Sequence, residues 1–91
     1  MQVFLKDPGA VLDYTMDWSG GYLQGGETIS TSVWVIFPGD MTQSAAGNTA
    51  TACTVTVQGG SAGQIYQLTN RITTSQGRTD ERSISVRVEQ R

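Results

Sequence analysis

The sequence predicts an all-β protein, an immunoglobulin-like antiparallel β-sandwich of about six or seven strands. Apolar and polar residues alternate through the last third, from Thr54 to Arg91, where two long strands joined by a polar turn are expected. Turn-forming residues recur about every 8–12 residues, and apolar positions nowhere repeat with the period of a helix. The 91 residues suffice for one core, so a single domain over residues 1–91 is expected.

The strands of the first half follow from alternation and turns. Residues 1–5 are apolar and are expected to form an N-terminal arm or an edge strand before the Pro8-Gly9 turn. A strand with one solvated face should follow and end at Gly20-Gly21, because one side of it collects the apolar residues Leu12, Tyr14, Met16 and Trp18. Glu27 to Phe37 is the next strand, with apolar residues on both faces, which predicts a bulge or burial of both faces.

The second half begins with the small polar residues from Met41 to Ala50, which predict a loop or a weak edge strand. Three more strands are expected, at residues 52–57, 65–72 and 81–89. Gly63 three residues before Tyr66 resembles the tyrosine corner of β-sandwiches. Asn70 shares a face with apolar residues and therefore needs a hydrogen-bond partner there. Trp34 is the expected large aromatic of the core.

Charge and cysteine content bound the function. The net charge is −2, which favours neither nucleic acid nor an anionic membrane as partner. The first 60 residues carry Lys6 against five acids, whereas the last 31 carry five arginines against three acids. Cys53 is the single cysteine and lies in a strand pattern, so a small buried side chain is expected and an internal disulfide is impossible. No signal peptide and no run of about 20 apolar residues is evident.

The chain offers no constellation for catalysis, a cofactor or a metal. It has no histidine, which removes histidine-dependent triads and histidine-ligated metals. Asp13 and Asp17 share a strand face but are separated by about 13 Å, beyond the spacing of paired catalytic carboxylates. The Gly59 to Gly63 run lacks the following helix and the lysine of a phosphate loop. We therefore expect no enzyme activity and no cofactor.

Residues that could bind a partner protein are the remaining candidates for a functional site. Arginine suits bidentate pairing with carboxylates at interfaces, although cross-strand pairing within the chain would use the same residues. The predicted docking hairpin carries Arg71, Arg78, Asp80, Glu81, Arg82 and Arg87. The predicted contact loop carries Trp18, Tyr22 and Leu23, of which Trp18 also suits the core. If the hairpin docks, Arg78→Glu should weaken partner binding and leave the melting temperature within a few degrees.

Two blocks of sequence resemble a known family. Residues 6–19 (KDPGAVLDYTMDWS) and 69–84 (TNRITTSQGRTDERSI) are similar to the opening and the closing hairpin of phage fibre–tail adaptor proteins. The resemblance covers nearly the whole chain, and residues 41–51 are its least distinctive part. The segment from Ser19 to Leu23 is richer in glycine than the family pattern, which would alter a contact loop. The family brings no catalytic or metal residues.

The resemblance implies a structural protein of a tailed-bacteriophage virion, assembled in the host cytoplasm, and the residues agree with it on a β scaffold with contact surfaces. Such an adaptor would link a fibre or tailspike to the tail or neck, in several copies in a symmetric ring. Its partners would be tail, neck or fibre proteins. A capsid decoration or head-completion protein is an alternative of the same class. A carbohydrate-binding module for a host glycan, with Trp18 or Tyr22 as stacking platform, is an alternative of another class.

Overall fold

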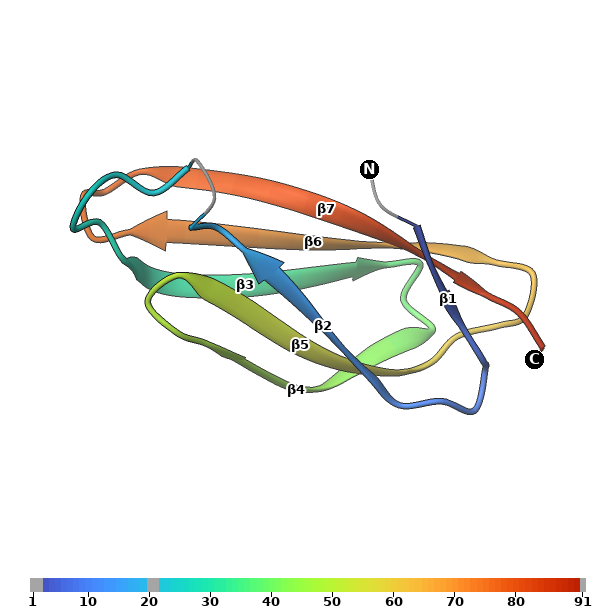
Figure 1. Cartoon of the computed structure of the whole chain (residues 1–91). Helices are drawn as coiled ribbons and strands as arrows, with labels where there is room; N and C mark the ends of the chain where they lie inside the picture. The colour runs from blue at the N-terminus through green and yellow to red at the C-terminus, as the bar shows by residue number, and fades with distance from the viewer. Residues whose placement is uncertain (1–2, 20–21, 91) are drawn as a thin grey trace.

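The computed structural model of the chain describes residues 3–19 and 22–90. The described residues form seven strands in two sheets and no helix (Figure 1). Gly20-Gly21, expected to end a strand, lies outside them. The strands are β1 (Val3–Lys6), β2 (Leu12–Asp17), β3 (Ile29–Phe37), β4 (Met41–Asn48), β5 (Ala52–Gly59), β6 (Ile65–Thr74) and β7 (Thr79–Val88).

One sheet has the strand order β1-β7-β6-β3 and the other β2-β5-β4. Every pairing is antiparallel except that of β1, which lies parallel to β7 with Val3 opposite Ser85. The predicted antiparallel sandwich thus has a parallel pairing at this edge. After Lys6 the chain crosses to the other sheet, where β2 begins (Figure 1). Residues 3–5 accordingly belong to an edge strand, one of the two predicted possibilities.

The partition of strands between sheets agrees with the immunoglobulin-like prediction. An immunoglobulin domain places its second, fourth and fifth strands in one sheet and its third, sixth and seventh in the other. The same strands are grouped here, with β1 added to the second group. The immunoglobulin-like assignment stays a prediction, whereas the sandwich-like, all-β arrangement of two sheets is confirmed.

The core lies between the two inner faces. The strong alternation of β6 and β7 places every second residue inward, with Tyr66 opposite Val86 and Leu68 opposite Ile84. Both tryptophans are buried, but Trp18 is fully enclosed and Trp34 retains 8% exposure. Trp18 is thus the most deeply placed large aromatic, although Trp34 was expected to fill that role. The inward residues are Tyr14, Trp18, Ile29, Trp34, Met41, Cys53, Val55, Val57, Tyr66, Leu68, Ile72, Ile84, Val86 and Val88.

The predicted tyrosine corner is present at the turn between β5 and β6. The backbone N–H of Ser61 donates to the phenol oxygen of Tyr66 at 2.7 Å. Gly60 sits beside this contact with φ of 94°, and an added Cβ would lie 3.0–3.3 Å from Val88, Met41 and Tyr66. The close approach and the positive φ together require glycine at this position. The turn therefore fixes the entry of β6 into its sheet.

The two edge strands β3 and β4 resolve the ambiguous parts of the sequence. A register shift between Ile29 and Thr31 is the predicted bulge in β3, and it brings Ile29 to the same face as Trp34. Burial of both faces does not occur, since Val33 and Val35 are each 56% exposed. Met41–Asn48 forms an edge strand, with its own shift between Gln43 and Ala45. All of its residues after Met41 are exposed, and it lies at the edge of its sheet.

Candidate protein-interaction surfaces

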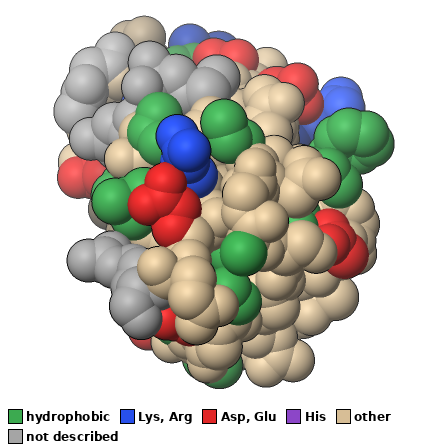
Figure 2. All heavy atoms as spheres, turned by 90° about the vertical axis from the view of Figure 1, so that its right-hand side faces the viewer, with side chains coloured by type: hydrophobic (Ala, Val, Ile, Leu, Met, Phe, Trp, Pro, Cys, Tyr) green, Lys and Arg blue, Asp and Glu red, His purple; other side chains and the backbone are tan. Residues whose placement is uncertain are grey.

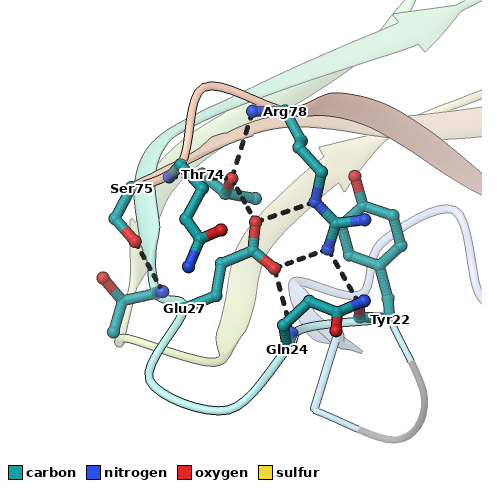
Figure 3. Close-up of polar contacts among 8 residues, drawn as sticks. Tyr22, Gln24, Glu27, Thr74, Ser75 and Arg78 are labelled. Atoms are coloured by element: carbon teal, nitrogen blue, oxygen red, sulfur yellow. Dashed lines mark hydrogen bonds and ion pairs between the residues drawn. The ribbon is translucent and has the colours of Figure 1, made fainter.

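An ion pair between the buried Glu27 and the half-buried Arg78 joins the β2–β3 loop to the β6–β7 turn at one end of the sandwich (Figure 3). Glu27 is only 3% exposed. Its carboxylate accepts hydrogen bonds from the Nε of Arg78 at 2.9 Å, from the same guanidinium's Nη2 and from the hydroxyl of Thr74. The backbone N–H of Gln24 donates a further bond at 2.9 Å. The three bonds from Arg78 and Thr74 tie the loop to a turn that lies about fifty residues away in sequence, and the bond from Gln24 closes the loop on itself.

The same guanidinium continues into an aromatic stack. Arg78 donates to the carbonyl oxygen of Tyr22 at 3.0 Å and lies 4.5 Å from the centre of its ring. Arg82 covers the ring of Trp18 at 4.5 Å and that of Tyr22 at 5.9 Å. The rings of Trp18 and Tyr22 meet edge to face at 5.2 Å. The residues predicted on the loop and those predicted on the hairpin thus come together, but they mostly contact one another.

Asn70 links this stack to the sheet. The indole N–H of Trp18 donates to the side-chain oxygen of Asn70 at 2.8 Å. The amide of Asn70 then donates to the hydroxyl of Ser32 at 2.9 Å and to the carbonyl of Val33 at 3.2 Å. The hydrogen-bond partner that the sequence demanded for Asn70 is therefore found, and it joins β6 to β3 and to the end of β2.

Electrostatics follow from these contacts. The hydrogen bonds from Arg78, from the backbone of Gln24 and from Thr74 lower the pKa of Glu27 from 4.5 to about 2. The carboxylate in turn raises the pKa of Arg78. Hydrogen bonds from the side chain and backbone of Ser19 lower the pKa of Asp17, which lies just before the loop. Glu27 is consequently ionised at any physiological pH, and its charge is matched inside the molecule.

The outer face of the four-stranded sheet is a second, separate surface. Arg71 and Glu81 are opposite each other on β6 and β7, and both point outward. Arg87 lies further along β7, is 51% exposed and pairs with Glu89 at 2.8 Å. Asp80 and Arg82 have the opposite orientation, because neighbours on a strand point to opposite faces. The predicted docking hairpin is therefore divided between two surfaces.

Charges elsewhere are interspersed. Figure 2 views the molecule from the end at the right of Figure 1, and acidic and basic side chains lie scattered there among polar and hydrophobic ones. No group of three or more acidic or cysteine side chains gathers as metal ligands within residues 3–19 and 22–90. No helix in the described part of the chain is long and apolar enough to cross a membrane. We therefore describe the surfaces by which side chains are exposed and which contacts they make.

Comparison with known families gives a match over most of the chain. The model of the family described as "Podophage GP4 fiber-tail adaptor protein gp77" matches residues 6–87. The chain belongs to this fibre–tail adaptor family. None of the curated proteins matches it. The family resemblance identified from residues 6–19 and 69–84 is therefore confirmed, and with it membership in a group of phage structural proteins.

Several residues proposed as adaptor contacts have to be reassigned. Trp18 is fully buried, so it belongs to the core and cannot touch a partner or a sugar. Tyr22 and Leu23 were expected to be exposed contact residues, but both are half-buried and pack against the core. Arg78 is held by Glu27 and Tyr22, which gives it a structural role within the chain. Arg71, Glu81 and Arg87 are the predicted contact residues that share the outer face.

The structure also exposes an apolar feature of the adaptor that sequence reasoning missed. Val33, Val35 and Phe37 point outward from β3, and Phe37 is 72% exposed. The available signal was the conflict of periodicity in this strand, from which we predicted a bulge or burial of both faces. Outward apolar residues on an edge strand explain the same conflict.

The depressed pKa of Glu27 predicts a specific pH dependence. Its stabilisation is complete above the ordinary pKa of 4.5 and is lost as the pH falls from there to about 2, where the folded-state carboxylate protonates. The melting temperature of the wild type should therefore fall more steeply over this range than that of Glu27→Gln. Circular-dichroism melts at about one-unit pH intervals measure the difference. Asp17 and Asp40, whose pKa values are also lowered, are common to both proteins and cancel in the comparison. Parallel curves would contradict the ion-pair assignment.

Proposed function

We propose that this protein is a virion adaptor that links a fibre or tailspike to the tail or neck of a tailed bacteriophage. The observation that carries the proposal is the match to the fibre–tail adaptor family over residues 6–87. In this account the adaptor assembles in the host cytoplasm and acts in several copies arranged as a symmetric ring. Its mechanism is rigid docking, in which separate surfaces of one sandwich hold two different partners.

The arrangement of the chain supports rigid docking. The Glu27–Arg78 pair and the Trp18–Asn70 bond fasten the loop end to the sheet, which keeps the orientation of any bound partner fixed. The outer face of the four-stranded sheet offers Arg71, Glu81 and Arg87 in exposed positions. The side chain of Arg71 makes no hydrogen bond or ion pair to the residues that the structure describes. Its guanidinium is therefore available for a carboxylate of a partner.

Loss of the outer-face arginines tests this docking surface. The double variant Arg71→Gln with Arg87→Gln should weaken binding to a tail or fibre protein of the same phage by about tenfold or more, with little change in melting temperature. Biolayer interferometry with purified partners measures the affinity. The double variant Gln43→Glu with Gln58→Glu is a control, because it changes the net charge equally from exposed positions on the other sheet. Equal binding by both variants would rule out the outer face.

The two alternatives are separated by simpler observations. A decoration protein would occur in hundreds of copies per particle, whereas an adaptor would occur in about six or twelve. Quantitative mass spectrometry of purified virions measures this number. The carbohydrate-binding alternative loses its proposed platform, since Trp18 is buried and the ring of Tyr22 is covered by Arg78 and Trp18. A glycan array that binds the protein would nevertheless revive it.

A further inference from the structure

The free edge of β3 has an unusual combination of exposure and apolarity. β3 is the last strand of its sheet, so one side of its backbone meets no neighbouring strand of that sheet. Its outward side chains Val33, Val35 and Phe37 are 56%, 56% and 72% exposed. The three form a continuous row, because alternate residues of a strand line one face. The row and the unpaired backbone edge lie side by side.

Devices that normally discourage pairing at such an edge are missing from this side of the sandwich. Natural edge strands carry charges, prolines or bulges, or are very short. The nine residues of β3 include no charged residue and no proline, and its register shift lies near the start at Ile29/Thr31, away from the apolar row. β4, the edge strand that contacts β3 from the other sheet, also carries no charge. The opposite side differs, because β1 has four residues and β2 carries Asp13 and Asp17.

We propose that β3 pairs antiparallel with β3 of a second copy of this chain, across a twofold axis at Val35. The two four-stranded sheets then become one continuous eight-stranded sheet. The spacing of the apolar row favours a second copy as the partner, because Val33 and Phe37 lie two residues before and after Val35. Antiparallel self-pairing sets Val35 against Val35 and Phe37 against Val33 of the second copy, so the whole row meets apolar side chains. Aromatic and β-branched residues are favourable cross-strand pairs.

The charges around β3 agree with a second copy as partner. β3 offers no counter-charge to a charged strand of another protein, whereas self-pairing brings no like charges together. Arg71 is the nearest charge on this face and is opposite Val33 on β6. Across the dimer interface, perpendicular to the strands, the row that begins at Arg71 continues through Val33 to Phe37 of the second copy. It ends at Gln67 of the second copy, which is opposite Phe37 on β6. The two arginines therefore remain at opposite ends of the interface.

Sedimentation velocity over a concentration series tests the proposal on the full chain without any partner. The wild type should change from monomer to dimer with rising concentration, and Val35→Lys should raise the dissociation constant at least about tenfold. Val35 points away from the core, so the melting temperature of the variant should stay within a few degrees. Val11→Lys is the matched control, because Val11 is also 56% exposed but precedes β2 on the other sheet. It should dimerise like the wild type.

A cysteine placed on the twofold axis reports the register. Val35→Cys should form a disulfide-linked dimer on mild oxidation, since directly opposed antiparallel residues have Cα atoms about 4.5–5.5 Å apart. Val11→Cys should not, and the native Cys53 is buried and does not compete. A wild type that stays monomeric up to about 1 mM, or a Val35→Lys variant that dimerises like the wild type, would overturn the proposal. Because no other protein takes part, these outcomes are independent of the adaptor role.

Discussion

Replacing Arg78 with glutamate should lower the melting temperature by more than about 10 °C. The change removes the guanidinium that holds Glu27 and places a second carboxylate beside it. Glu27 is almost fully enclosed, so water cannot replace the guanidinium as its partner. Arg78 itself is 39% exposed, so solvent screens part of its charge, and the burial of Glu27 carries the effect. This result would reverse the expectation from sequence, in which Arg78→Glu affects binding and leaves stability unchanged.

Thermal melts of matched variants measure this effect. Arg87→Glu is the control, because it makes the same substitution at a half-exposed arginine whose partner Glu89 is also exposed. Its melting temperature should change by no more than about 3 °C. The double variant Glu27→Gln with Arg78→Gln should be more stable than Arg78→Glu, since it leaves no buried charge unpaired. Equal melting temperatures for Arg78→Glu and Arg87→Glu would show that the Glu27 pair contributes nothing.

Asn70→Leu should reduce the free energy of unfolding by about 2–3 kcal/mol. Leucine is similar in size, but it leaves the indole N–H of Trp18 buried without its acceptor and takes a donor from the carbonyl of Val33. Chemical denaturation monitored by tryptophan fluorescence measures the loss. Gln67→Leu is the control, because Gln67 lies on the same strand but points outward, and it should change stability by at most about 0.5 kcal/mol. A neutral Asn70→Leu would mean that the polar link is dispensable.

Local pattern was sufficient to predict much of the fold. The long strands β6 and β7 were predictable because their alternation is unbroken, and the corner at Tyr66 because its glycine and tyrosine have a characteristic spacing. The need of Asn70 for a partner followed from its position on an apolar face. The identity of that partner, Trp18, did not follow, since Trp18 comes directly after β2, a strand of the other sheet.

The features that the sequence did not predict depend on contacts between segments far apart in the chain. Lys6 and Glu27 are charged residues, yet both are buried. Lys6 donates to the carbonyl oxygen of Gly59 at 2.8 Å, and Glu27 receives Arg78. No local pattern distinguishes these residues from solvated ones. The same reason explains why Arg78 was taken as a contact residue and why the parallel pairing of β1 was missed.

Cryo-electron microscopy of the intact virion would test the adaptor role most directly. The account predicts density for this sandwich between a ring protein of the tail or neck and a fibre or tailspike, repeated with the symmetry of the ring. The outer face with Arg71 and Arg87 should contact one of these partners. Density on the capsid lattice, or a particle that lacks this protein, would contradict the account.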